Sequence, residues 1–182
     1  MTYEIIRSSR RTVGIQVKDG RVIVRAPHFA LKSEIEEIVR THRGWIEKQL
    51  LRDAAAKEAE ETAVKFTERE LKEIGREARK RIPERVSFYA ERVGVRYGRI
   101  SFRFQKTRWG SCSSKGNLSF NCLLVLAPPE VLDSVVAHEL CHRKEMNHSA
   151  RFYAEVLKAF PEYKKWNGWL KKHGKELLSR LP

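Results

Sequence analysis

One short stretch, Val135–His142, constrains this chain more than any other part of its sequence. It reads Val-Val-Ala-His-Glu-Leu-Cys-His, and a third histidine, His148, follows six residues later. Residues four apart share one face of an α-helix, so His138 and His142 can present two imidazoles to a single metal ion. Glu139 is placed to hold a metal-bound water rather than the metal. The pattern predicts a catalytic metal site on a helix; two surface histidines on an amphipathic helix are the alternative.

His148 favours the metal site, because a hydrolytic zinc site has three protein ligands and one open position for water. In a continuous helix, His138 and His148 would stand about 15 Å apart and on different faces. The chain must therefore leave the helix between them. We expect Asn147 to end the helix in the left-handed conformation and Ser149 to cap a new helix that begins at Ala150. The predicted site holds one Zn²⁺ ion per chain.

The net charge of the 182-residue chain is +14, and such a surface attracts anions, including nucleic acid, nucleotides and acidic proteins. Residues 1–100 contain 23 Lys and Arg against 16 Asp and Glu, and residues 101–182 contain 14 against 7. Because the surplus is the same in both parts, the sequence indicates a basic chain without a defined binding stripe. Binding of nucleic acid through this basic surface remains one of our hypotheses.

The predicted compartment is the cytoplasm, with no membrane contact. The three cysteines, Cys112, Cys122 and Cys141, form no recognisable pairing, and their odd number favours a reducing environment. The amino terminus lacks a signal-peptide pattern, and no apolar run approaches the roughly 20 residues of a membrane span. Cys141 is expected to be buried packing, because it points away from the ligand face of the helix.

The first 52 residues are predicted to form a lobe of a β-hairpin and a helix. The strand pattern over residues 13–25 turns at Asp19-Gly20, a strong hairpin signal. Ser33 and Glu36 have the spacing of a capping box and predict the start of a helix that continues to Leu50. The segment that follows is rich in Ala, Glu and Lys and indicates a solvated helical connector over residues 53–66.

Residues 67–182 are predicted to form the catalytic core. Thr67 and Glu70 form a second capping box, and Pro83 suits the first turn of a further helix. Strands are expected over residues 99–105 and 118–126, on either side of a turn-rich loop, as an antiparallel sheet beside the motif helix. Two prolines and an acid at residues 128–130 are typical of the first turn of that helix.

Several segments resemble the YgjP-like family of metal-dependent hydrolases, which is related to the SprT and WLM metallopeptidases. They are Arg108-Trp109-Gly110-Ser111-Cys112-Ser113, Asn117-Leu118-Ser119-Phe120-Asn121, Leu126-Ala127-Pro128, His138-Glu139-Leu140-Cys141-His142 and Asn147-His148-Ser149. The resemblance implies an α+β fold with a zincin-like catalytic core, in which a small antiparallel sheet packs on helices. It also implies that His138, His142 and His148 bind zinc and that Glu139 is the catalyst.

The expected chemistry is metal-assisted hydrolysis. Zinc held by three neutral imidazoles lowers the pKa of its water to about 7, and Glu139 takes the proton as general base. Arg108 is our candidate for stabilising the developing oxyanion, and Tyr153 is the alternative. The liganding histidines also need hydrogen-bond partners for their outer ring nitrogens.

Three functions are compatible with these residues. A zinc metallopeptidase is favoured by the resemblance, with a peptide or protein as substrate. A nucleotide hydrolase that cleaves a phosphoanhydride would use the same chemistry, and the basic surface suits its substrate. The third is a nucleic-acid-binding module with a structural zinc. Structural sites usually close with a fourth ligand, commonly cysteine, and the motif offers none at a suitable spacing.

Overall fold

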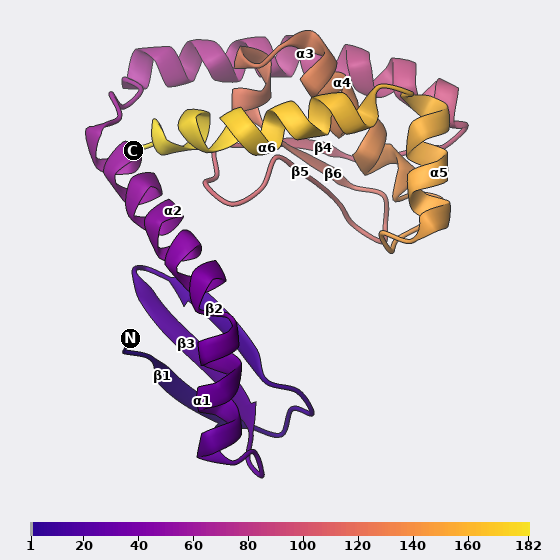
Figure 1. The fold of residues 1–182 in the computed structure, drawn as a ribbon. Coiled ribbons are helices and arrows are strands. Elements are labelled where there is room, and N and C mark those ends of the chain that lie inside the picture. The colour runs from indigo at the N-terminus through magenta and orange to yellow at the C-terminus, as the bar shows by residue number, and fades with distance from the viewer. Residues whose placement is uncertain (1) are drawn as a thin grey trace. The chain divides into compact units, whose positions relative to one another are not determined.

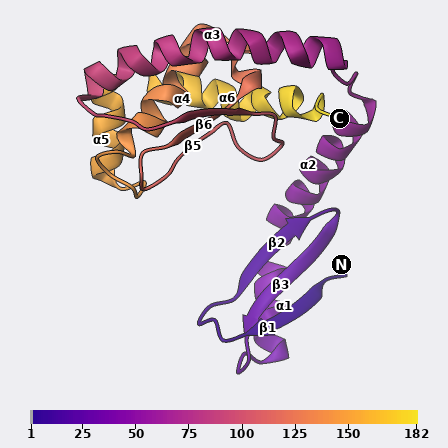
Figure 2. The same ribbon diagram turned by 180° about the vertical axis from the view of Figure 1, so that it is seen from behind.

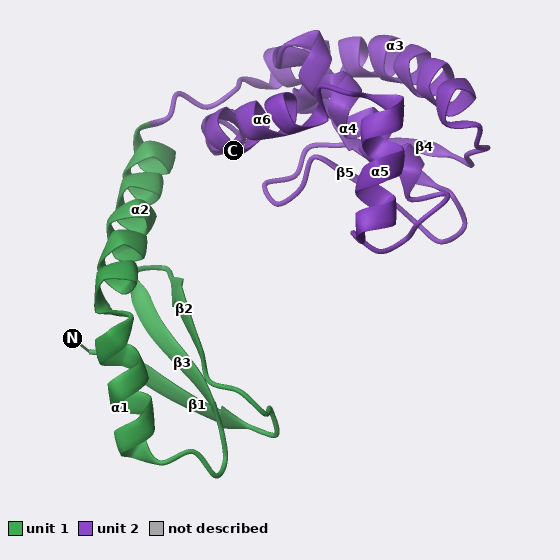
Figure 3. Cartoon of the chain, turned by 45° about the vertical axis from the view of Figure 1, so that its right-hand side comes forward, with its two compact units in different colours: residues 1–62 green, residues 63–182 purple. Residues whose placement is uncertain are grey.

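The computed structural model describes residues 2–182 and confirms the α+β prediction, with six α-helices and two three-stranded sheets in this range. The chain forms two compact units, residues 1–62 and residues 63–182 (Figure 3). Each unit has its own buried apolar core. Within residues 2–182, no helix combines the length and the apolar content that crossing a membrane would require.

The first unit is a three-stranded sheet covered by helices (Figure 1). Its elements are β1 (Glu4–Ser8), β2 (Gly14–Lys18), β3 (Arg21–Pro27), α1 (Lys32–Thr41) and α2 (Arg43–Thr62). The strand order is β1-β3-β2, with β1 parallel and β2 antiparallel to β3. The predicted hairpin is confirmed, because Asp19 and Gly20 join β2 to β3 with φ of 52° and 72°. Val24, Ile35 and Ile46 are fully buried in the core of this unit.

The predicted capping box at Ser33 and Glu36 is wrong. Helix α1 already begins at Lys32, and Leu31 takes the cap position. The Glu34 carboxylate accepts a hydrogen bond from the Leu31 backbone N–H at 2.9 Å. Glu34 therefore satisfies the helix start from inside the first turn, and no Ser or Thr side chain is needed.

The second unit places its sheet against a set of helices (Figures 1 and 2). Its elements are α3 (Glu68–Val93), β4 (Ile100–Arg103), β5 (Gly110–Cys112), β6 (Leu118–Asn121), the 3₁₀ turn η1 (Cys122–Leu126), α4 (Pro129–Cys141), α5 (Ala150–Ala159) and α6 (Tyr163–Ser179). The predicted capping box of α3 is confirmed: the Thr67 hydroxyl accepts from the Glu70 N–H, and the Glu70 carboxylate accepts from the Thr67 N–H.

Helix α3 does not break at Pro83, which corrects the prediction of a new helix there. Proline removes one N–H from the helix and normally bends or ends it. On either side of Pro83, however, Ala78, Ile82, Val86 and Tyr89 are all buried in one core. Packing along this continuous face holds the two halves together, so tertiary contacts override the local preference of the proline.

The sheet of the second unit is mixed, whereas a wholly antiparallel sheet was predicted. Its order is β4-β6-β5; β5 is antiparallel and β4 is parallel to β6. The chain reverses once between β4 and β5 and again between β5 and β6, so the first and third strands run in the same direction. The predicted strand also ends at Asn121, whose side-chain oxygen accepts from the Leu123 N–H and starts the turn η1.

Candidate metal centre and active site

Helix α4 presents the motif, and its position is fixed by burial. It begins at Pro129, as predicted, and Val131, Leu132, Val136 and Leu140 are almost completely buried. These side chains pack in the same core as the buried face of α3. The apolar face leaves the ligand-bearing end of α4 little freedom to move.

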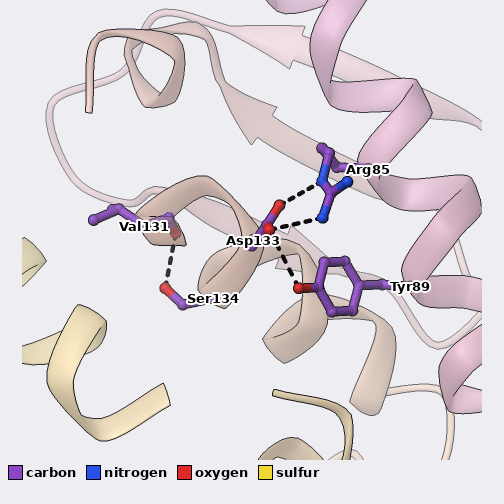
Figure 4. Close-up of polar contacts among 5 residues, drawn as sticks. All are labelled: Arg85, Tyr89, Val131, Asp133 and Ser134. Atoms are coloured by element: carbon purple, nitrogen blue, oxygen red, sulfur yellow. Dashed lines mark hydrogen bonds and ion pairs between the residues drawn. The ribbon is translucent and has the colours of Figure 1, made fainter. Parts of the chain in front are cut away.

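A bidentate ion pair also ties α4 to α3 (Figure 4). The Arg85 guanidinium donates to both carboxylate oxygens of Asp133, at 2.6 and 2.7 Å, and the Tyr89 hydroxyl donates to the same carboxylate at 3.2 Å. Ser134, one residue later, donates to the Val131 carbonyl within the helix. The guanidinium fork fixes the orientation of α4 as well as its distance from α3.

Three histidines converge at the end of α4. Their ligand atoms all lie within 4.8 Å of one another. The Nε2 atoms of His138 and His148 are 3.0 Å apart. Two imidazole nitrogens bound at about 2.0–2.1 Å to one tetrahedral zinc ion would stand roughly 3.3 Å apart. The structure thus brings together His138, His142 and His148, the three ligands predicted from the sequence, at a separation that suits one metal ion.

The outer nitrogens of the two helical histidines are satisfied. Nδ1 of His138 lies 2.9 Å from the Tyr163 hydroxyl, and Nδ1 of His142 lies 3.2 Å from the Glu145 carbonyl. A carbonyl oxygen can only accept, so the proton of His142 is on Nδ1 and its Nε2 is left with a free lone pair. If Nε2 of His138 binds a metal, Nδ1 carries the ring proton and donates it to the Tyr163 hydroxyl.

The fully buried ring of Phe152 packs against all three histidines. Its centroid lies 4.8 Å from that of His138, 4.5 Å from that of His142 and 4.9 Å from that of His148. Phe152 belongs to α5, the helix that follows the third histidine. One aromatic ring therefore positions imidazoles that come from two different elements.

The chain leaves α4 earlier than predicted. The helix ends at Cys141, and the carbonyl of Cys141 accepts from the N–H groups of Lys144 and Glu145. Asn147 is not left-handed, since Asp19 is the non-glycine residue with positive φ among residues 2–182. The predicted cap at Ser149 is confirmed, because its hydroxyl accepts from the Phe152 N–H at 3.2 Å.

The segment after His142 is attached to two other loops, one between α3 and β4 and one between β5 and β6. Arg143 donates from Nε to the Arg96 carbonyl at 3.2 Å and from Nη1 to the Ser114 carbonyl at 3.0 Å. Lys144 forms an ion pair with Glu155 of α5. These contacts hold the turn in place of a left-handed residue and direct His148 back toward α4.

Glu139 is buried beside the histidines, on the side of strand β5. Only 6% of the residue is exposed. Burial raises the pKa of its carboxyl to about 8, and the positive charge of Arg108 acts in the opposite direction. A Cβ atom on Gly110 would meet the Glu139 Oε1 at 2.6 Å and the Cγ at 2.7 Å. Strand β5 can lie against this carboxylate only because residue 110 has no side chain.

Burial, together with the neighbouring His142 and His148, lowers the pKa of His138 to about 3. Burial is also the main cause of the lowered pKa of His142. Both imidazoles are therefore neutral at pH 7, which is the form that binds a metal.

The two oxyanion candidates lie in different surroundings. Arg108 is exposed in the loop between β4 and β5, and its charge reaches the Glu139 carboxylate. Asn121, which is fully buried, donates to the Arg108 carbonyl at 3.2 Å and holds this loop. Tyr153 lies on α5 with its ring stacked 6.2 Å from that of His148, and 41% of it is exposed.

A cavity of about 170 Å³ opens beside His138 and Glu139. It lies among α4, α6 and the start of β5, and its lining consists of Trp109, Gly110, Ser134, Val135, His138, Glu139, Tyr163, Asn167 and Leu170. None of these nine residues is Lys or Arg. The cavity therefore suits an uncharged group of a ligand bound at the metal centre.

Three residues that shape the site were not predicted from the sequence to do so. Tyr163 is 25 residues from its partner His138, Phe152 reads as ordinary core, and Gly110 reads as a turn residue. Tyr163 has one weak signal, since it is the first residue of a helix that follows the motif. The other two depend on contacts between distant elements, which a local pattern does not encode.

Two solved structures are similar to part of this chain. They are the metallopeptidase zymogens abylysin of Pyrococcus abyssi and jannalysin of Methanocaldococcus jannaschii, with identities of 23% and 21%. Each match covers 50% of this chain, and 93% and 94% of the respective structures, with a TM-score of 0.45. A search of curated proteins gave no match.

The sequence pattern of one family covers most of the chain. It is described as the YgjP-like metallopeptidase domain, and it matches residues 11–74 and residues 57–173. These ranges include all three histidines, Glu139 and the strand that contains Gly110. The chain belongs to the YgjP-like family of metallopeptidases.

Proposed function

We propose that this protein is a zinc-dependent peptidase in which Glu139 is the general base. The family supports a metal-dependent peptidase, and the histidine cluster supports the choice of zinc. Three neutral imidazole nitrogens are a typical ligand set of catalytic zinc, which leaves one position open. Zinc bound there would supply Lewis acidity, activating water and polarising the scissile carbonyl.

The residues of the chain divide the remaining work. Glu139 accepts the proton of the attacking water and returns it to the leaving amine. Its buried position against β5 keeps the carboxylate pointed at the histidines, and Tyr163 and the Glu145 carbonyl keep two imidazoles in the correct orientation.

The cavity beside the histidines is the observation that favours a peptide over a nucleotide. It is lined by apolar and neutral polar groups, together with Glu139, and contains no cation. A triphosphate bound there would place several negative charges in a cavity without Lys or Arg, where zinc alone would offset the cost of burying them. A neutral side chain of a peptide fits the same space without this cost.

Arg108 is the better candidate for the oxyanion. Its charge already acts at the Glu139 carboxylate, whereas the ring of Tyr153 stacks on His148. We expect Arg108→Gln to lower kcat by roughly 10²-fold, as loss of one oxyanion donor does in other enzymes, with KM nearly unchanged. If Tyr153→Phe lowers kcat and Arg108→Gln does not, the assignment is reversed.

The proposed function is tested by incubating the zinc-loaded wild type and Glu139→Gln with an unfolded protein, a peptide library and nucleoside triphosphates. We expect the wild type to cleave peptide bonds and Glu139→Gln to bind zinc without turnover. Glu130→Gln, at the other end of α4, is the matched control and should remain active. Release of phosphate instead of new peptide termini would show a nucleotide hydrolase, and undiminished turnover by Glu139→Gln would exclude the general-base role.

A further inference from the structure

The positive charge of the protein is concentrated in the second unit. Residues 1–62 contain 12 Lys and Arg against 10 Asp and Glu, whereas residues 63–182 contain 25 against 13. The excess of cations over anions is therefore 2 in the first unit and 12 in the second. A surface with this excess attracts polyanions.

Helix α3 separates its charges into two rows. Lys72, Arg76 and Lys80 are exposed at successive four-residue steps, which places them on one line along the helix. A second line, about a quarter turn away, consists of glutamates: Glu73, Glu77, Glu84 and Glu91. Like charges four residues apart destabilise a helix, whereas mixed charges would stabilise it. Each cation also has a glutamate three or four residues before it, Glu68 before Lys72, Glu73 before Arg76 and Glu77 before Lys80, which is the spacing of helix-stabilising pairs.

These cations are available to a ligand. Lys72, Arg76 and Lys80 form no ion pair within the described residues 2–182. Arg79 borders the same row, and its guanidinium donates to the Gly75 carbonyl at 2.9 Å. The basic row thus lies on an exposed flank of α3, and its three cations are not held in ion pairs among the described residues.

A groove with an aromatic floor lies beside the basic row. It has a volume of about 370 Å³ and is lined by Glu68, Leu71, Lys72, Gly75, Arg79 and Phe104. Phe104 follows β4, and 40% of the residue is exposed. A Cβ on Gly75 would stand 3.8 Å from the Phe104 ring, so this ring lies close against α3. An exposed aromatic ring and cations therefore share one groove.

We propose that this groove binds single-stranded nucleic acid, with a base stacked on Phe104 and phosphates beside Lys72 and Arg76. Single strands are bound without sequence preference where a positively charged track runs beside exposed aromatic rings. A duplex keeps its base faces stacked and does not offer one to Phe104, so the exposed ring favours a single strand over a duplex. The combination of ring and charge selects the single strand among polyanions.

The groove is separate from the metal centre. It adjoins α3 and the end of β4, whereas Glu139 and the histidines lie on the side of β5. These two strands form opposite edges of the sheet, with β6 between them. Binding in the groove therefore requires neither zinc nor Glu139.

The role of the basic row is tested by fluorescence anisotropy of the full chain with a labelled oligothymidylate of about 12 nucleotides. The slope of log K against log salt should fall by about 1.4 in the double variant Lys72→Gln/Arg76→Gln, because two phosphate contacts are lost. Lys171→Gln/Lys172→Gln removes the same charge from exposed positions of α6 and should leave the slope nearly unchanged. An equal loss in both double variants would show diffuse charge and overturn the proposal.

The aromatic contact is tested separately. Phe104→Ala should weaken binding about ten-fold without changing the salt slope, and Phe104→Trp should restore it. Thermal unfolding of each variant confirms that it is folded, and Glu139→Gln should bind like the wild type even if the peptidase proposal fails. No effect of Phe104→Ala, equal affinity for a duplex of the same length, or equal competition by polyglutamate would each contradict a single-strand site.

Discussion

The two halves of the metal centre are built in different ways. His138 and Glu139 lie on a helix that is buried along its apolar face and tied to α3 by the Arg85–Asp133 ion pair. His148 lies in an exposed loop, which is held by hydrogen bonds of Arg143 and by the packing of Phe152. The helical half is rigid before any metal binds, whereas the loop half depends on a few contacts. The difference teaches that His148 is the position at which metal binding would be most closely coupled to local order.

Removal of a ligand should have the largest effect and should separate the two halves. Both His138→Ala and His148→Ala should lose zinc and all turnover, because two imidazoles are too few for a hydrolytic site. Only His138→Ala should also lower the stability of the metal-free protein, since its ring packs against Phe152 and Tyr163 in a largely buried place. Metal analysis and thermal unfolding measure both effects.

His28→Ala removes an exposed histidine of the first unit and is the control for these variants. It should retain one zinc ion and full activity. If His148→Ala kept one zinc per chain, the three-histidine centre would be wrong, and the loop would have a different role.

A side chain at residue 110 should displace Glu139 and lower activity without loss of the metal. In Gly110→Ala the new Cβ would collide with Oε1 and Cγ of Glu139, so the carboxylate must shift. A displacement on the order of 1 Å can lower kcat by about 10²-fold. Gly168→Ala is the matched control, since its Cβ would enter open space. Wild-type kcat in Gly110→Ala would show that β5 does not position Glu139.

Loss of the Tyr163 hydroxyl should weaken metal binding in the helical half. Tyr163→Phe preserves the ring but removes the hydrogen-bond partner of His138, and such partners contribute about 10–100-fold to metal affinity. Titration with a competing chelator measures this change. Tyr97→Phe, which alters an exposed ring of the same unit, should have wild-type affinity. Equal affinities in the two variants would rule out a positioning role for Tyr163.

The ion pair behind α4 should have the smallest effect on the site and a measurable effect on stability. Arg85→Ala leaves the mostly buried Asp133 carboxylate without its partner. Because Arg85 is partly exposed and solvent screens the pair, we expect a loss of about 1–2 kcal/mol in the free energy of unfolding. Urea denaturation of Arg85→Ala, Asp133→Ala and the double variant gives the coupling energy. A coupling close to zero would mean that packing alone holds α4.

The same division explains what the sequence could predict. The spacing of His138 and His142 follows from helix geometry, and the cap at Ser149 follows from local chemistry, so both were readable in advance. The turn after His142 was not, because contacts of Arg143 with distant carbonyls replace the expected left-handed Asn147. The prediction of a new helix at Pro83 was wrong for a related reason, because packing of the buried face of α3 keeps the helix continuous at this proline.

Contacts between elements account for the remaining gaps. The parallel pairing of β4 with β6 depends on the path of the whole chain, and the separation of charge between the units appears only when their boundary is known. Local periodicity therefore predicted most elements and the shared face of His138 and His142, whereas tertiary contacts determined which residues support them.

X-ray absorption at the zinc edge tests the three-histidine centre most directly. The zinc-loaded wild type should show three imidazole nitrogens and one further light ligand at about 2.0–2.1 Å, with no sulfur at about 2.3 Å. His148→Ala should lose one imidazole contribution or the bound zinc altogether. A sulfur contribution, or an unchanged spectrum in His148→Ala, would contradict a site built from His138, His142 and His148.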